Sequence, residues 1–295
     1  MKKNLEPRLE RFLAILPWDE LACQLNLETG MPETDIRSTL TTYANEAHVT
    51  LNMVGDSLSP GQRILEIGAG LCLFSLFLKS EGFEITALEP SRGGYGFFEQ
   101  SRQAIAKQFP SLELPVLTCP AEALTPEKQG SFDIIFSNNV IEHIPDWEAA
   151  LAAMSAILAI DGRMIHACPN YFVPYEPHYG IPVFRYWPSI SKKLFLPADA
   201  DPEIWDSLNF ISYRQVRNFA GRRSLYLRFR QGLLYNVLMR MNTDPLFRER
   251  HKGPVAVIVS MLNATGAMRL LKHLPAAVST PMIFELSSIP LQEQP

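Results

Sequence analysis

The sequence predicts an α/β protein built on a mostly parallel sheet with helices on both faces. The apolar run at residues 64–67 ends in a glycine turn and leads directly into a helical segment, which is typical of a central parallel strand. A second apolar run, at residues 85–88, ends in Glu89, and strands continue to alternate with helical segments to residue 170. This alternation favours a doubly wound sheet.

The turn after the first strand indicates a nucleoside-containing cofactor. Gly68 and Gly70 allow the backbone to turn sharply and approach a ligand without Cβ atoms in the way. Glu89, at the end of the next strand, is placed to accept hydrogen bonds from both hydroxyls of a ribose. The dinucleotide pattern G-x-G-x-x-G is incomplete because Leu73 takes the third glycine's place. Glu66 would repel a pyrophosphate but attract a cationic cofactor, and S-adenosylmethionine carries a sulfonium and an ammonium.

At these residues the sequence resembles the class I S-adenosylmethionine-dependent methyltransferases, whose first motif is an acid followed by G-x-G. The blocks at 120–124, after a strand expected at 114–118, and at 132–145, with its V-I-E-H stretch, resemble the small-molecule branch of that family. A fifth strand is expected at 163–168, after a turn at 160–162. The resemblance implies a Rossmann-like sheet of seven strands, with an N-terminal helical lid and inserted C-terminal helices.

The resemblance also implies which residues bind S-adenosylmethionine. Glu122 approaches the adenine amino group, and Asn138 and Asn139 lie beside the methionine part. Cys72 stands at the family's third glycine-like position. The complete cofactor set is Glu66, Gly68, Ala69, Gly70, Glu89, Pro90, Ala121, Glu122, Asn138 and Asn139.

Three parts follow along the chain: a helical lid (1–58), the cofactor-binding core (59–170), and a region with the acceptor loop, inserted helices and final strands (171–295). The lid contains a helical segment from 32 to 51. The polar side chains of interest in this segment are Tyr43, Asn45, Glu46 and His48. They are expected to face the cofactor or the acceptor, and the alternative is that they face only solvent. The final strands are expected at 225–229 and 282–286.

The segment 169–182 is the expected acceptor loop because it follows the fifth strand at the ligand-binding edge of the sheet. Four prolines keep it extended. Its candidate catalytic residues are His178 as general base and Glu176 as its orienter or an alternative base, with His143 second. The predicted substrate-binding residues are Tyr171, Tyr175 and Tyr179. The alternatives are a purely structural loop and a His143 that only caps or packs a helix.

Charge and composition limit the partners. Between Arg214 and Lys252 stand ten Lys or Arg and two acids, although the whole chain carries a net charge of −4. This asymmetry favours an anionic partner, unless neighbouring acids balance a solvated basic face. No nucleic-acid-binding module accompanies the basic segment, so no nucleic acid is expected. The four cysteines form no C-x-x-C pair, so neither a metal site nor a disulfide is expected.

The apolar segment 253–268 is expected to form a buried helix. The alternatives are an interfacial helix, which would give a peripheral membrane contact beside the basic segment, and a homodimer-forming helix. Asn263 and Thr265 keep the segment short of a bilayer-spanning length. The first residues lack the apolar run of a signal peptide, so a cytoplasmic location is expected, with a membrane-peripheral one as the alternative.

The predicted function is methyl transfer from S-adenosylmethionine to a small-molecule or lipid- or sugar-linked acceptor. The transfer is an in-line displacement, assisted by deprotonation through a histidine and a glutamate. The alternatives are a non-catalytic partner protein that binds S-adenosylmethionine and a nicotinamide-dependent dehydrogenase, which Glu66 and Leu73 disfavour. The sequence leaves open which acceptor is methylated and whether at oxygen, nitrogen or carbon.

Overall fold

The structure is a computed structural model that describes residues 2–90, 96–198, 200, 202–243, 248 and 253–291. It consists of two compact units. Unit 1 comprises Met1–Asn138 and Glu148–Ile165, and unit 2 comprises Asn139–Trp147 and His166–Pro295. The predicted division into three functional parts along the chain stays a prediction.

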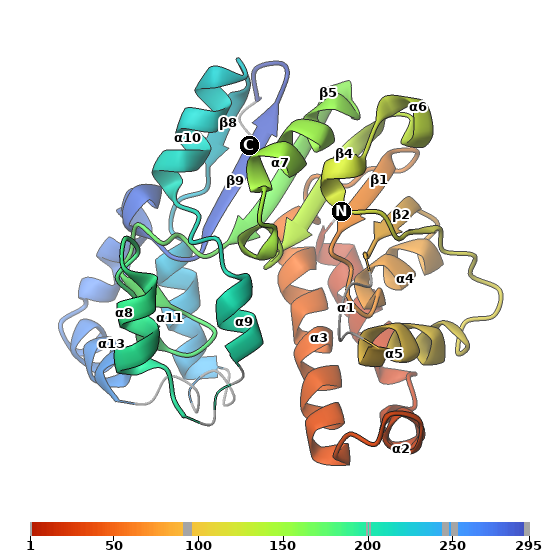
Figure 1. Cartoon of the computed structure of the whole chain (residues 1–295), viewed down its shortest axis with the longest axis horizontal. Coiled ribbons are helices and arrows are strands. Elements are labelled where there is room, and N and C mark those ends of the chain that lie inside the picture. The colour runs from red at the N-terminus through yellow and green to blue at the C-terminus, as the bar shows by residue number, and fades with distance from the viewer. Residues whose placement is uncertain are drawn as a thin grey trace. The chain divides into compact units, whose positions relative to one another are not determined.

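Seven strands form one sheet in the order β3-β2-β1-β4-β5-β9-β8 (Figure 1). β1 pairs in parallel with β2 and β4, β2 pairs in parallel with β3, and β8 pairs antiparallel with β9. The strands are β1 (Arg63–Ile67), β2 (Glu84–Leu88), β3 (Val116–Leu117), β4 (Phe132–Asn138), β5 (Leu158–Cys168), β8 (Tyr226–Phe229) and β9 (Met282–Ser287). The mostly parallel, doubly wound sheet confirms the predicted fold class.

Unit 1 begins with three helices, in the region predicted to be a helical lid. In the first helix, Leu5, Leu9 and Phe12 recur at helical spacing and are buried, so one apolar face packs inward. The helices of this unit are α1 (Lys2–Ala14), α2 (Trp18–Thr29), α3 (Glu33–Val54), α4 (Leu73–Ser80), α5 (Gly96–Ala106), η1 (Ala121–Ala123), α6 (Pro126–Gln129) and α7 (Trp147–Ala156), whose first residue belongs to unit 2.

Unit 2 contains the segment predicted to be the acceptor loop and the helices that follow it. The loop forms a small antiparallel hairpin of β6 (Tyr175–Glu176) and β7 (Ile181–Pro182). It packs on a core of Tyr171, Ile181, Val183, Trp205 and Leu208. The helices of this unit are η2 (Ile141–His143), α8 (Pro188–Phe195), α9 (Pro202–Ser207), α10 (Tyr213–Arg222), α11 (Leu233–Thr243), α13 (Pro254–Ala264), η3 (Ala267–His273) and η4 (Ala276–Val278).

Three predicted element boundaries were wrong. β3 has two residues instead of five because Pro115, just before it, has no N–H to donate to a ladder. β5 begins at Leu158, so the predicted turn at 160–162 lies within the strand; a Cβ on Gly162 would stand 3.0 Å from the Asp133 carbonyl, and glycine permits that approach. The V-I-E-H stretch ends in the short turn η2, and α7 starts only at Trp147 because Pro145 disfavours a helical conformation at the preceding residue.

The prediction of a buried helix at 253–268 was also wrong. Val259 is buried, but Val257, Ile258 and Met261 are 59%, 53% and 64% exposed. Among the elements that the structure describes, α13 packs mainly against α11 and η3, which lie on the side of Val259 and away from this other face. No helix in the described part of the chain is long and apolar enough to cross a bilayer.

Part of the basic segment is balanced locally. Arg228 and Arg230 both form ion pairs with the buried carboxylate of Glu285, at 2.6 and 2.8 Å. These two arginines are therefore engaged within unit 2. Residues 244–247 and 249–252 of the predicted basic segment lie outside the described residues.

Candidate functional site

The loop between β1 and α4 has the backbone that its glycines predict. Gly68 and Gly70 adopt φ of +67° and +53°. The N–H groups of Gly68 and Ala69 donate to the Leu88 carbonyl at 2.8 and 3.1 Å, which fixes the loop to the end of β2. A Cβ on Gly70 would overlap the ring of Tyr43 from α3. Gly70 is therefore required both by its left-handed backbone and by this close approach.

Cys72 adopts a left-handed backbone conformation that glycine usually occupies. Its φ is +56°, directly before α4, which a non-glycine residue adopts at a cost of roughly 1–2 kcal/mol. The side chain is fully buried and packs with Ala69 and Ala87. Burial raises the pKa of the Cys72 thiol, so the thiol stays neutral and acts as a packing group.

Glu89 lies where the sequence places it, at the end of β2. Its Oε2 accepts a hydrogen bond from the Gly70 N–H at 2.7 Å, so the acid also holds the glycine loop. Burial raises the pKa of Glu89, and the bond from Gly70 opposes that shift. A carboxylate has about four lone-pair positions, which leaves capacity for two ribose hydroxyls. Pro90 follows, half-buried, and residues 91–95 are outside the described chain.

Glu66 borders a cavity of about 40 Å³ in unit 1. Its Oε2 accepts a hydrogen bond from the Ser75 hydroxyl. Burial, with a further contribution from the charge of Glu89, raises the pKa of Glu66 to about 7. The residues around the cavity are Tyr43, Glu46, Ala47, Thr50, Glu66, Gly68, Ala69, Leu73, Phe74 and Asn138.

The end of β4 and helix α3 both border this cavity. The Asn138 side-chain amide donates to Glu46 at 2.7 Å and to the Thr50 hydroxyl at 3.2 Å. The carboxylates of Glu46 and Glu66 both border this cavity. Their negative charge suits a ligand that carries a sulfonium and an ammonium. These residues fit the cationic end of S-adenosylmethionine.

The sequence found only part of the α3 surface. Tyr43 and Glu46 border the cavity, whereas Asn45 is exposed and neither Asn45 nor His48 is among its lining residues. Ala47 and Thr50 were missed. The signal was the spacing 43, 46, 47 and 50, which places four residues on one helical face.

The remaining predicted cofactor residues do not border this cavity. Ala121 is buried in η1, and Glu122 beside it is half-buried. Asn139 belongs to unit 2, is exposed and has a φ of +55°; its N–H donates to the Ala167 carbonyl at 2.9 Å. A role for these three in cofactor binding stays a prediction.

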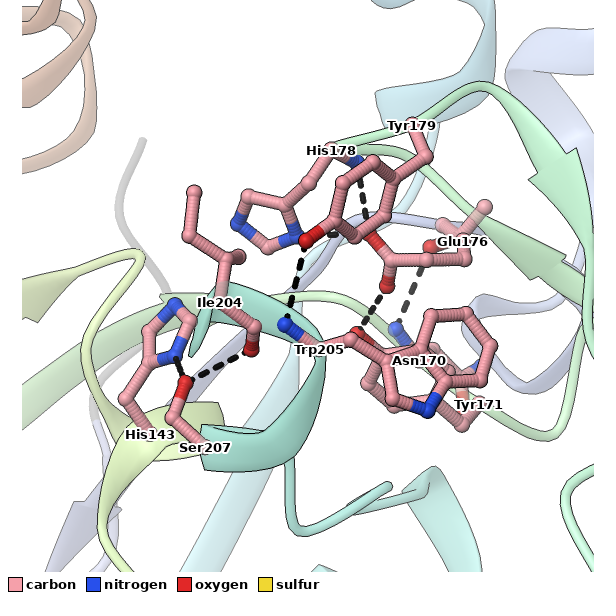
Figure 2. Close-up of polar contacts among 10 residues, drawn as sticks. His143, Asn170, Tyr171, Glu176, His178, Tyr179, Ile204, Trp205 and Ser207 are labelled. Carbon is pink, nitrogen blue, oxygen red and sulfur yellow. Dashed lines mark hydrogen bonds and ion pairs between the residues drawn. The ribbon is translucent and has the colours of Figure 1, made fainter. Parts of the chain in front are cut away.

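In unit 2 the predicted catalytic pair is assembled on the acceptor loop (Figure 2). Glu176 is fully buried. Its Oε1 accepts hydrogen bonds from the backbone N–H and from the Nδ1 of His178, both at 2.6 Å, and its Oε2 accepts one from the Tyr171 hydroxyl. A carboxylate that accepts at this position assigns the ring proton to Nδ1, so the lone pair of the His178 imidazole is on Nε2.

His143 is oriented by a similar relay. Its Nδ1 lies 2.6 Å from the Ser207 hydroxyl, which donates its own proton to the Ile204 carbonyl at 2.7 Å (Figure 2). Ser207 must then accept from Nδ1, which leaves the lone pair on His143 Nε2. The rings of His143 and His178 are 5.3 Å apart. Burial and the neighbouring His178 lower the pKa of His143 to about 4, so the imidazole is neutral at pH 7.

The three tyrosines take different positions. Tyr171 is 1% exposed and lies in the core of unit 2, where burial and the charge of Glu176 raise the pKa of its hydroxyl. It therefore holds Glu176 from the core, and contact of the three tyrosines with an acceptor stays a prediction. Tyr179 is half-buried and its hydroxyl accepts from the Trp205 N–H at 3.1 Å, and Tyr175 is half-buried in β6.

Sequence reasoning missed the residues that support this cluster. Asn209 donates its side-chain amide to the carbonyls of Ile141 and Ile144 at 2.7 and 2.8 Å, and its backbone N–H to the Glu142 carbonyl at 2.8 Å. It thereby holds turn η2, on which the fully buried Glu142 precedes His143. Only the V-I-E-H stretch pointed to Glu142; no local pattern marks Ser207 or Asn209.

Comparisons with known proteins identify the family of the chain. A family profile described as a methyltransferase domain matches residues 42–231. The uncharacterised protein Rv1509 of Mycobacterium tuberculosis is 32% identical over 242 residues, which cover 78% of this chain and 80% of that protein. The ubiquinone biosynthesis O-methyltransferase of Caulobacter is 33% identical over 110 residues, 37% of this chain and 42% of that protein.

Two solved structures are similar at low sequence identity. The phosphoethanolamine N-methyltransferase 2 of Haemonchus contortus, in complex with phosphomonomethylethanolamine and S-adenosylhomocysteine, is 14% identical with a TM-score of 0.47, over 82% of this chain and 51% of that one. The magnesium protoporphyrin IX methyltransferase of Synechocystis, with bound S-adenosylmethionine, is 16% identical with a TM-score of 0.41, over 66% and 74%.

The family profile covers more than half of the chain and includes the glycine loop, Glu89 and the end of β4. The predicted enzyme class and cofactor are thereby confirmed, and the dehydrogenase alternative is set aside. The chain belongs to the class I S-adenosylmethionine-dependent methyltransferases.

Proposed function

We propose that the protein methylates a small molecule at an O–H or N–H group and that His178 removes the proton. The observation that carries this proposal is the Glu176–His178 pair. The buried carboxylate fixes the imidazole through Nδ1 at 2.6 Å and leaves Nε2 as the basic atom. An imidazole held by a carboxylate in this way is a recurrent arrangement for a general base.

One set of residues binds the cofactor and another set acts on the acceptor. S-adenosylmethionine supplies the electrophilic methyl group. Glu66 and Glu46 favour its cationic end, and Glu89 binds its ribose. On the acceptor side, His178 takes the proton onto Nε2, and Glu176 stabilises the imidazolium that results. General-base assistance of this kind contributes about 10²–10⁴-fold to the rate.

The acceptor that we favour is a phenolic or enolic hydroxyl on a lipid-linked ring. The partial similarity to a ubiquinone biosynthesis O-methyltransferase supports this choice. Unit 2 also exposes large apolar side chains on and just before α8, which would suit a lipid-linked substrate; they are Tyr186, Trp187, Ile190 and Leu194.

A separate cavity, in unit 2, supports an acceptor that carries an anionic group. It measures about 370 Å³ and is lined by Phe172, Tyr213, Arg214, Arg217 and Ala277. Arg214 lies over the ring of Phe172 at 4.8 Å, which holds the guanidinium in place. Arg214 and Arg217 are the two members of the predicted basic segment that line this cavity.

The test is an acceptor screen that measures formation of S-adenosylhomocysteine and is followed by variants on an active acceptor. The panel contains phenols, catechols and amines, with and without a prenyl chain. We expect His178→Ala to lower kcat by about 10²–10⁴-fold with an unchanged Kd for S-adenosylmethionine. The matched control is His273→Ala, because His273 is an exposed histidine in η3. A His178→Ala enzyme with wild-type kcat would remove His178 as the base.

A further inference from the structure

Three potential ligand residues converge in unit 2. Glu142, His143 and His178 each offer one ligand atom, and these three atoms all lie within 4.8 Å of one another. Glu142 and His143 come from turn η2, and His178 comes from the acceptor loop, 35 residues later in the chain. The turn and the loop are each fixed by their own hydrogen bonds, so the grouping does not depend on one flexible side chain.

Both imidazoles are oriented as metal-binding histidines are. The Nδ1–H of His178 is held by Glu176 and that of His143 by the Ser207 hydroxyl, each at 2.6 Å. Histidines that bind metals commonly donate their second ring N–H to a carboxylate or another oxygen, which fixes the tautomer and the ring direction. In this cluster both Nε2 atoms carry the lone pair, as ligation requires.

The local charge also favours a cation. Glu142 and Glu176 are both fully buried, and the negative charge of each acts on the same Tyr171 hydroxyl. Two carboxylates and two imidazole lone pairs are thus gathered in one small region. Buried carboxylates are normally neutralised by a basic side chain, a proton or a metal ion.

We propose that Glu142, His143 and His178 bind a divalent transition-metal ion of the zinc class. Tetrahedral bonds of about 2.0–2.2 Å place two ligand atoms about 3.3–3.6 Å apart around one ion, so ligand atoms that now lie within 4.8 Å of one another would move together by up to about 1.5 Å. Two nitrogens and one carboxylate oxygen suit Zn²⁺, and three protein ligands leave a position for a substrate oxygen.

This inference deepens the proposed function and rests on it for its chemical role. In the metal-bound protein the ion occupies His178 Nε2, and it replaces that nitrogen in activating the acceptor. A hydroxyl bound to such an ion has a lowered pKa and releases its proton to solvent. The oxygen then forms the new C–O bond while the S–C bond breaks and leaves its electron pair on sulfur. The acceptor class that follows is a hydroxyl compound able to coordinate a metal, such as a catechol or a keto-enol.

The spacing along the chain explains why the sequence predicted no metal site. Ligand pairs are recognised when two ligands recur at a short fixed spacing, as in C-x-x-C or H-x₃-H. Glu142 and His143 are adjacent, and the third ligand arrives on a different element. Only the fold brings the three together.

The first experiment measures metal binding without substrate. Tag-free protein is stripped with a chelator and titrated with Zn²⁺ by calorimetry and with Co²⁺ by visible absorption, with bound metal counted by mass spectrometry. We expect one ion per chain and d–d bands of a low-coordinate Co²⁺ site. Glu142→Gln and His178→Ala should each abolish stoichiometric binding, and Glu176→Gln should weaken it about 10–100-fold. His273→Ala should bind as the wild type does.

Two results would overturn the proposal: no stoichiometric binding by the wild type, or unchanged binding in the Glu142→Gln/His178→Ala double variant. Circular dichroism and binding of S-adenosylmethionine report whether each variant is folded. Activity then separates the two proposals. If the metal-free enzyme turns over at the full rate, methyl transfer with His178 as base stands and the metal role fails. If metal binds but no acceptor is methylated, the site stands and the proposed function fails.

Discussion

At the scale of single residues, we expect Glu66 to make cofactor binding depend on pH. Its pKa of about 7 belongs to the cofactor-free protein and results mainly from burial. A cation beside the carboxylate favours the ionised form and lowers that pKa, so binding below pH 7 must first release a proton. We expect the Kd for S-adenosylmethionine to be flat above pH 7 and to rise by up to about tenfold per pH unit below it.

Calorimetry from pH 5.5 to 8.5, in buffers of different ionisation enthalpy, measures both the affinity and the proton released. Glu66→Gln is the matched variant because the amide keeps the shape and has no proton to lose. Its affinity should be lower and independent of pH over this range. A wild-type Kd that does not change between pH 5.5 and 7 would show that Glu66 is not the group that meets the cation.

Gly70 is the second residue whose role can be isolated. A Cβ there meets the ring of Tyr43, and φ is +53°. Gly82 offers the control, since its φ is +84° and a Cβ there would meet nothing within 4 Å. Gly82→Ala should lower the free energy of unfolding by roughly 1–2 kcal/mol through backbone strain alone. Gly70→Ala should cost more than that and should weaken cofactor binding.

The double variant Tyr43→Ala/Gly70→Ala tests the steric part of this argument. When the ring is absent, Gly70→Ala should lower the free energy of unfolding only as much as Gly82→Ala does, because backbone strain alone remains. Denaturant unfolding of Gly70→Ala, Gly82→Ala, Tyr43→Ala and the double variant against the wild type provides the comparison. Equal costs at Gly70 and Gly82 would mean that the ring of Tyr43 moves aside freely, and the lid contact would then have no energetic weight.

At the scale of elements, we expect helix α3 to control entry of the cofactor to the cavity that its residues line. The cavity of about 40 Å³ beneath it holds little more than one water, which occupies about 30 Å³ in the liquid, whereas ligand pockets measure roughly 300 Å³ or more. We therefore expect the face of α3 that carries Tyr43 and Glu46 to shift when the cofactor binds. We expect Tyr43→Ala to raise the association rate constant several-fold.

Stopped-flow fluorescence with S-adenosylhomocysteine measures this rate. Thr42→Ala is the control because Thr42 is exposed on the same helix and is not among the residues lining the cavity. Hydrogen exchange should show greater protection of α3 once the cofactor is bound. Identical association rates for Tyr43→Ala and the wild type would place the slow step elsewhere.

Elements built from local sequence were predicted well, and contacts between distant segments were not. β1, β2 and the loop at Gly68 follow from apolar runs and glycines that are contiguous in the chain. Ser207 and Asn209, which hold His143 and its turn, lie more than 60 residues from it and have no local signature. The burial of Tyr171 could not be predicted either, because the loop composition suits both a core and a contact residue.

The exposed face of α13 illustrates the same limit in the opposite direction. The apolar composition of residues 253–268 is compatible with a buried helix and with a surface helix. Its environment depends on how many elements cover it, and α11 and η3 cover only one side. Composition reports that the helix can be buried, and tertiary packing decides whether it is.

At the scale of the whole molecule, the arrangement of exposed apolar and basic side chains supports contact with an anionic membrane surface. Trp187 and Leu194 are 64% and 62% exposed around α8, with the exposed Lys193 beside them. Tryptophan favours the bilayer interface, and each nearby lysine or arginine adds about 1 kcal/mol of attraction to anionic lipid. We expect the protein to sediment with vesicles containing phosphatidylglycerol at low salt and to be released at high salt.

The variants separate the apolar contribution from the charge. Trp187→Ser/Leu194→Ser should reduce vesicle binding at least tenfold because burying either side chain in the interface contributes about 1.5–3 kcal/mol. Leu27→Ser, which removes an 81% exposed leucine from α2 in unit 1, should bind as the wild type does. Equal losses in both variants would mean that exposed apolar area in general drives sedimentation. No binding of the wild type at low salt would contradict membrane contact and would favour an acceptor that diffuses freely.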